Sequence, residues 1–211
     1  MYKSNVMENL TTRRLLLIAC AAALAVAFIV ALTRPAHADG AITVPAVPDG
    51  LGVTAAEGKV FLVGHATGFQ NYVCLPSGAG FAYSLFTPQA ILFDNNEQII
   101  THFFSTNPDE NNTIRATWED SRDSSRVWAA TVPNGASTDE KFVAKNSVAW
   151  LKLKAVGHRD GPSNGDRLSN VTFVQRLNTH GGVAPLTGCA SLADVGTRAF
   201  VPYTADYFFY K

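Results

Sequence analysis

Toward its C-terminus the chain reads Val171-Thr-Phe-Val-Gln-Arg-Leu177 and then Val201-Pro-Tyr-Thr-Ala-Asp-Tyr-Phe-Phe-Tyr210. Both segments are rich in β-branched and aromatic residues, which favour strands. Similar runs recur between turn signals from residue 60 onward, and no segment shows the 3.6-residue apolar period of a long helix. The sequence therefore predicts an all-β protein.

Strand alternation indicates which faces are buried. Leu151 and Leu153 alternate with Lys152 and Lys154, so the leucine face of this predicted strand is expected to point inward. The segment 171–177 has apolar residues on both faces and is expected to be covered on both sides. A single-domain antiparallel β-sandwich and a partly closed barrel both fit this pattern, and the sequence does not choose between them.

Two shorter features refine this arrangement. Tyr203, Tyr207 and Phe209 have the same parity in their strand, so they are expected to pack inward together. The run Asp94-Asn-Asn-Glu97 between two apolar segments predicts a hairpin turn, because Asn and Asp tolerate the positive φ values that tight hairpins need. The strands on either side of this turn are therefore expected to pair.

The first 38 residues have the three parts of an export signal. A basic start ends in Arg13-Arg14, an apolar run covers residues 15–32, and Ala36-His-Ala38 is a small-x-small cleavage site. We expect cleavage after Ala38 and a secreted or periplasmic protein with no stable membrane span. If it is not cleaved, the apolar run is long enough to anchor the chain in a bilayer. Residues 39–57 read as an extended lead-in and residues 58–211 as the β-domain.

The charge of the mature chain argues against nucleic acid as a partner. Removing residues 1–38 removes four of the 17 basic and one of the 17 acidic side chains, which leaves 13 and 16 and a net charge of −3. Non-specific affinity for nucleic acid requires several clustered Lys or Arg on phosphates. No such cluster is present in the sequence, so the expected partner is an unknown small molecule, a glycan or a protein.

Cys74 and Cys189 are the two cysteines of the mature chain. An oxidising compartment favours their pairing. In the chain-entropy model, closing a loop of this length contributes about 4.7 kcal/mol. We predict a Cys74–Cys189 disulfide, with two buried free thiols as the alternative.

The common catalytic and cofactor signatures are absent from the sequence. It contains no Gly-x-Ser-x-Gly, Gly-x-x-x-x-Gly-Lys, Gly-x-Gly-x-x-Gly, His-Glu-x-x-His or Cys-x-x-Cys. No cofactor and no metal site is expected. A weaker alternative is a metal site formed by two or more of the four mature histidines, which would require the fold to bring them together. His65 and His102 lie in apolar strand segments, which predicts core histidines.

Arg176 and His180 are the first pair of candidate ligand-binding residues. His180 precedes Gly181-Gly182, where the backbone could approach a ligand closely. Arg176 is expected to reach toward the loop end of its sheet. There its rigid fork of donors would pin loop carbonyls or a carboxylate such as Asp206, or hold an anion beside His180.

Trp118 and Asp120 are the second pair of candidates. Glu119-Asp120 and Asp123 form the densest acidic cluster next to an aromatic residue, which could support acid–base chemistry or simply be a solvated loop. Neighbouring strand residues point to opposite faces, so Glu119 and Asp120 are not expected to face one substrate.

Several runs occur in an order that resembles the domain of unknown function 3455 family, whose members are exported proteins without an established biochemical role. They are Gly68-Phe-Gln-Asn-Tyr-Val-Cys74, Pro88-Gln-Ala-Ile-Leu-Phe-Asp94, Trp118 and Ala149-Trp-Leu-Lys-Leu-Lys-Ala155, and the resemblance covers about residues 58–211. The hypothesis that fits best is a non-catalytic exported binding module or an envelope component. The alternative is an exported hydrolase or other enzyme with a loop-built site near Arg176 and His180, so the question of catalysis stays open.

Overall fold

The computed structural model describes residues 41–211, so the predicted signal peptide lies outside the described residues. In chain order the elements are β1 (Val60–Ser77), β2 (Gly80–Asp94), β3 (Glu97–Asn107), the 3₁₀ turn η1 (Pro108–Glu110), β4 (Thr113–Asp120), β5 (Arg126–Ser137), β6 (Trp150–Arg159), β7 (Phe173–Gly181), the 3₁₀ turn η2 (Leu192–Asp194) and β8 (Arg198–Tyr210). Within residues 41–211, no helix is long and apolar enough to cross a membrane.

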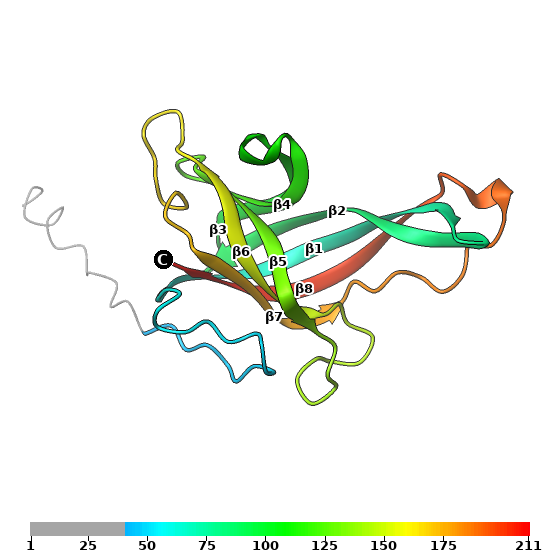
Figure 1. The fold of residues 1–211 in the computed structure, drawn as a ribbon, viewed down its shortest axis with the longest axis horizontal. Coiled ribbons are helices and arrows are strands. Elements are labelled where there is room, and N and C mark those ends of the chain that lie inside the picture. Colours follow the sequence, from blue (N-terminus) through cyan, green and yellow to red (C-terminus); the bar gives the residue numbers. More distant parts are fainter. Residues whose placement is uncertain (1–40) are drawn as a thin grey trace, which may run out of the picture. The chain divides into compact units, whose positions relative to one another are not determined.

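The strands form one closed antiparallel barrel in which each strand pairs with the next along the chain (Figure 1). β1 closes the ring because it pairs with β2 on one side and with β8 on the other. The register between the first and last strands runs from Val60 opposite Tyr210 to Val73 opposite Arg198. The all-β prediction is confirmed, and of the two arrangements that the sequence left open the structure has the barrel.

The hairpin predicted at residues 94–97 is confirmed. Asp94 pairs with Glu97 at the end of the β2–β3 ladder. Asn95 and Asn96 have φ values of 47° and 67°. Both residues lie in the left-handed region, which a two-residue hairpin of this kind requires.

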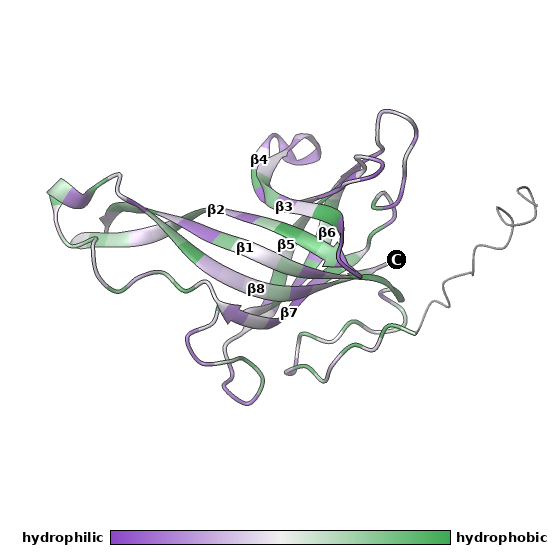
Figure 2. Ribbon diagram, turned by 180° about the vertical axis from the view of Figure 1, so that it is seen from behind, coloured by the Kyte–Doolittle hydropathy of each residue, from purple (hydrophilic) through white to green (hydrophobic). Residues whose placement is uncertain are grey.

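The main core fills the inside of the barrel, where alternation places it. Tyr203, Tyr207 and Phe209 of β8 all belong to this core, as predicted, and Leu153 of β6 joins them. Figure 2 shows the corresponding alternation of hydrophobic and hydrophilic residues along β1 and β8. The period of two in the sequence therefore corresponds to the inside and outside of the barrel wall.

Strand β7 is covered on both sides, as its composition predicts. Val174 packs in the main core, whereas Phe173 and Leu177 belong to a second apolar cluster on the outer face of β7 and β8. Leu51 is fully buried in this second cluster. The lead-in, which forms no strand or helix over its described residues, therefore packs against the outer wall of the barrel.

A buried lysine anchors the lead-in. Lys152 points outward from β6, as predicted, but it is buried beneath the lead-in rather than solvated. Its ammonium donates to the carbonyl of Gly52 at 2.8 Å and lies 2.8 and 2.9 Å from the two carboxylate oxygens of Glu57. The Lys152 hydrogen bond, helped by the backbone N–H of Thr54, lowers the pKa of Glu57 from 4.5 to about 2.

This ion pair predicts an acid-sensitive contribution to stability. Because the folded pKa of Glu57 is depressed, its stabilisation is complete above about pH 4.5 and is lost as the pH falls to about 2. At neutral pH, Glu57→Gln should therefore have a lower melting temperature than the parent. At about pH 2 the two proteins should melt at the same temperature. Thermal melts across this range measure the difference, with Glu140→Gln at an exposed position as the control. Identical melting of parent and Glu57→Gln at neutral pH would contradict the prediction.

β1, β2 and β8 continue beyond the barrel as a three-stranded extension (Figure 1). β2 pairs with β3 only over residues 90–94, whereas its pairing with β1 runs on to Gly80. The predicted disulfide joins Cys74 of β1 to Cys189 in the β7–β8 loop, with the Cα atoms 5.5 Å apart. The alternative of two free thiols is therefore wrong, and the bond ties the β7–β8 loop to the extension.

Candidate functional site

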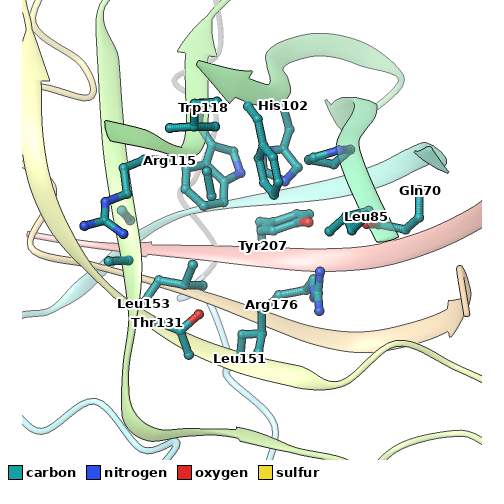
Figure 3. Close-up of a pocket in the computed structure, with 16 residues that line it drawn as sticks. Gln70, Leu85, His102, Arg115, Trp118, Thr131, Leu151, Leu153, Arg176 and Tyr207 are labelled. Atoms are coloured by element: carbon teal, nitrogen blue, oxygen red, sulfur yellow. The ribbon is translucent and has the colours of Figure 1, made fainter. Parts of the chain in front are cut away.

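A cavity of about 300 Å³ lies on the inner side of the barrel wall (Figure 3) and opens to solvent beside the exposed residues Leu85 and Ile114. It lies where β4 and β5 separate, since these strands pair only from Ala116 opposite Ala129 to Glu119 opposite Arg126. Ala116 and Ala129, which face each other across β4 and β5, both line the cavity. Their small side chains leave space on the inner side of the wall.

The walls of the cavity are mostly apolar. Leu151 and Leu153 of β6 form one side, and Phe104 of β3 and Leu85 of β2 contribute another part of the lining. Trp118 of β4 completes it from above in the view of Figure 3. Such a lining favours the apolar body of a small molecule.

An aromatic cluster holds one end of the cavity in a fixed shape. The rings of His102 and Trp118 are stacked, with centroids 4.4 Å apart and an interplanar angle of 8°. Tyr207 lies tilted against His102 and edge-on to Trp118, at centroid distances of 5.1 and 5.6 Å. Phe209 packs edge-on beneath Trp118. These offset and edge-on contacts are the favourable geometries for aromatic pairs, so this end of the cavity is well ordered by packing.

His102 is an uncharged member of this cluster. Its Nδ1 donates to the carbonyl of Thr117 at 2.8 Å, which is the arrangement of a neutral ring. Burial lowers the pKa of His102 to about 3, and the nearby positive charge of Arg176 acts in the same direction, while the Thr117 hydrogen bond opposes them. The core role predicted for His102 is confirmed by its burial.

Tyr203 and Tyr207 place two hydroxyl groups in the interior, 3.3 Å apart. Burial raises the pKa of Tyr207, although the guanidinium of Arg176 counteracts this. Burial also raises the pKa of Tyr203 well above its usual value, Tyr207 adds to the rise, and Arg176 and Gln70 act against it. Both phenols therefore stay protonated and neutral at ordinary pH.

Arg176 brings a charged group to the cavity from β7 (Figure 3). Its Nε and Nη2 donate to the carbonyl of Ala149 at 3.1 and 2.9 Å. Pinning a loop carbonyl is one of the roles expected for this residue. The carboxylate named as its possible partner, Asp206, bonds instead to His65 and Asn178.

Two further polar groups of the lining lack partners. Gln70 is 1% exposed and its Nε2 makes no hydrogen bond within the described residues. The indole Nε1 of Trp118 is also buried without a partner there. Unsatisfied buried donors are uncommon in folded proteins and are often found where a ligand or water completes the structure. Gln70 was not predicted as a candidate from the sequence. It lies four residues after Ala66 in the same strand, and this even spacing indicates that both side chains point inward.

The structure brings two of the four candidate residues together. Trp118 and Arg176 line the same cavity, whereas His180 and Asp120 do not. His180 is exposed and faces shallow depressions on the outside of the barrel, beside Thr204. Its neighbour Gly182 has a φ of 82° and packs closely against Tyr203 and Gln70 inside.

Asp120 stabilises a turn of the fold and does not reach the cavity. It is fully buried at the end of β4, where it accepts from the backbone N–H groups of Arg122 and Asp123 at 2.9 and 3.1 Å. Its second oxygen lies 3.2 Å from the guanidinium of Arg167. Asp120 therefore holds the β4–β5 turn and a neighbouring loop. Glu119 pairs with Arg126 and lies on the opposite face, as alternation predicts.

The outer surface carries a different histidine–carboxylate pair. His65 is exposed, so the prediction of a core histidine is wrong; its parity puts it on the outer face of β1. Its Nδ1 lies 2.6 Å from Asp206, which also accepts from Asn178 at 2.7 Å. The pair is open to water, with the His65 side chain 63% exposed. Within residues 41–211, no group of three or more His, Cys, Asp or Glu side chains is placed to hold a metal ion.

The fold and the site define a closed eight-stranded antiparallel barrel with an internal, mostly apolar cavity. The family model described as Protein of unknown function (DUF3455) matches residues 54–211, and the chain belongs to this family. The resemblance noted in the sequence is thereby confirmed. No curated protein and no solved structure matches the chain.

Proposed function

We propose that the mature protein binds one small, largely apolar molecule inside its barrel and does not act as a catalyst. The observation that carries this proposal is the cavity bounded by Ala129, Leu153 and Trp118 within a closed ring of strands. An eight-stranded barrel is just wide enough to be filled by side chains or to hold one small ligand. Ala116 and Ala129, whose small side chains leave space on the inner side of the wall, favour a bound ligand over an interior filled by side chains.

The size of the cavity also supports a guest. Protein interiors are close-packed, and voids larger than one water molecule are few. The cavity of about 300 Å³ has the volume of roughly ten water molecules. A preformed, largely apolar pocket of this size is therefore more readily understood as a binding site than as a packing defect.

The alternative of a hydrolase built around Arg176 and His180 has less support. Arg176 lines the interior, while His180 lies in depressions of the outer surface, so one substrate would have to contact both sides of the barrel wall. The histidine that does contact a carboxylate, His65, is exposed and belongs to the outer surface. This distribution favours binding over catalysis.

We further propose that the protein acts outside the cytoplasm, secreted or periplasmic, after cleavage of residues 1–38. The export signal in the sequence and the Cys74–Cys189 bond both support this location, since structural disulfides persist in oxidising compartments. N-terminal sequencing of the exported protein should begin at Asp39. A mature chain that begins at Met1 would contradict the proposal.

The binding function is tested by filling the cavity. Ala129→Leu should weaken binding of the neutral fluorescent probe N-phenyl-1-naphthylamine by at least about ten-fold, because the added side chain occupies the space of the guest. Probe titrations followed by fluorescence measure the affinity, and thermal melts establish that the variant is folded. Ala116→Leu fills the same cavity from β4, directly opposite Ala129, and provides a second variant.

Ala82→Leu is the matched control, because Ala82 is exposed on the extension, away from the cavity. It should bind the probe like the parent. If Ala129→Leu and Ala116→Leu fold and still bind the probe with parental affinity, the probe does not occupy the cavity and the proposed site is wrong. Absence of probe binding to the parent would also count against it.

A further inference from the structure

Two guanidinium groups face the cavity, and only one of them has a carboxylate partner. Arg115 donates from Nε and Nη2 to the two oxygens of Glu110, each at 2.8 Å. Arg176 forms no ion pair with any residue of the described chain, 41–211. It donates two N–H groups to the single carbonyl of Ala149, and a guanidinium has five such donors. Three further donors of Arg176 remain, and the guanidinium is close enough to the Tyr207 hydroxyl to oppose, by hydrogen bonding, the rise that burial causes in the pKa of that phenol.

The lining supplies no negative charge to balance Arg176. Among the described residues that line the cavity, none is Asp or Glu. Tyr207 keeps its proton because burial raises its pKa, and His102 is neutral because burial lowers its pKa to about 3. Arg176 is half-buried, so water solvates part of its charge, but no carboxylate of the lining neutralises it. An anion that enters the cavity supplies the missing counter-charge.

A second, independent observation points to the same end of the cavity. In Figure 3, Arg176 and Gln70 lie toward the side on which the hydroxyl of Tyr207 points, with Trp118 across the cavity. The Nε2 of Gln70 is buried and makes no hydrogen bond of ordinary geometry among the described residues, although the amide is near enough to the Tyr203 hydroxyl to oppose the rise that burial causes in the pKa of that phenol. A charged fork and a neutral amide donor can together bind the two oxygens of one carboxylate. The apolar wall of Leu153 and Trp118 then faces the rest of the guest.

We propose that the guest is an amphipathic monoanion, a carboxylate in the simplest case, whose charged group binds Arg176 and Gln70 while its apolar body lies against Trp118 and Leu153. This inference rests on the proposed binding function. The cavity volume of about 300 Å³ suits a short apolar chain or a single aromatic unit. A carboxylic acid with a chain of about ten carbons is a suitable probe, because the cavity has the volume of roughly ten water molecules.

The experiment compares decanoate with decan-1-ol, which differ in charge and little in the apolar chain. Both are titrated as competitors of N-phenyl-1-naphthylamine in the full mature protein. Decanoate should bind at least about ten-fold more tightly than decan-1-ol, because hydrogen bonds to charged groups are the strong ones. Arg176→Gln should abolish the preference for decanoate over decan-1-ol. Gln70→Leu should reduce the preference by a smaller factor.

Arg122→Gln is the matched control, because it makes the same change in net charge at an exposed residue that pairs with Glu97. It should keep the full preference for decanoate. If Arg176→Gln does not fold, Arg176→Lys is used instead, because it retains the charge without the planar guanidinium. This variant should weaken binding of decanoate more than binding of decan-1-ol. If Arg176→Lys lowers the affinity for both ligands equally, the inference is wrong.

The outcomes separate this inference from the function on which it rests. If the parent binds the neutral probe in the cavity but shows no preference for decanoate, the monoanion is wrong and the binding function stands. The same conclusion follows if Arg176→Gln folds and keeps the preference. If the parent binds neither the neutral probe nor decanoate, the proposed function itself is wrong.

Discussion

Loss of the Cys74–Cys189 bond should lower the free energy of unfolding by about 2–5 kcal/mol, the usual range for a native disulfide in a small exported domain. The two cysteines are 115 residues apart in the sequence, so the bond excludes many unfolded conformations. Cys74→Ala combined with Cys189→Ala removes the bond and leaves no reactive thiol. Alanine is preferred at position 74 because this position is fully buried and a serine hydroxyl there would need a partner.

Thermal melts of the double variant, and of the parent with and without reductant, measure the effect. Binding of N-phenyl-1-naphthylamine should stay close to the parental value below the melting temperature, because the bond lies on the extension and lines no part of the cavity. The parent treated with a thiol-alkylating reagent, with its intact mass recorded, controls for incomplete oxidation. Equal melting of oxidised and reduced parent would show that the bond does not stabilise the fold.

Trp118→Ala should be the most damaging single substitution in the barrel interior. Replacing a buried Trp by Ala usually costs about 3–5 kcal/mol. Trp118 is completely buried, stacks on His102 and contacts Tyr207 and Phe209 edge-on. In a domain of this size, such a loss lowers the melting temperature by roughly 10 °C. The adjoining cavity should also become larger and bind N-phenyl-1-naphthylamine differently.

Trp118→Phe is the informative comparison. It keeps an aromatic ring in the cluster and removes an indole N–H that has no partner in the described structure. Removing an unsatisfied buried donor recovers part of the lost packing energy, so its cost should be well below that of Trp118→Ala. Thermal melts of the two variants test this order. Similar, small effects of both substitutions would mean that the aromatic cluster contributes little to stability.

The local features of the fold followed from the sequence because they depend on local rules. Alternation identified the inner faces of β6 and β8, and the asparagine pair at residues 95–96 identified a hairpin. Closure of the barrel could not be predicted, since a sandwich and a barrel have the same alternation. The difference lies in the pairing of β1 with β8, which are the farthest apart of the strands in the sequence.

The candidate site was harder to predict because a bulge changes the parity of β7. Arg176 and His180 are four residues apart, so an undistorted strand would place both on one face. The β7–β8 register shifts between Leu177 and His180, and Asn178 within this interval has a φ of 49°. The bulge leaves Arg176 inside and His180 outside.

The pairing of β1 with β8, which closes the barrel, must be the last strand pairing to form during synthesis. Each pair of consecutive strands can form from neighbouring segments, but β1 meets β8 only after all the intervening chain has been made. Until then, the free sides of β1 and of the newest strand are open edges that invite pairing with other chains. The last strand to emerge is thus the one that protects the first, and a chain truncated before β8 should aggregate rather than remain a smaller folded barrel.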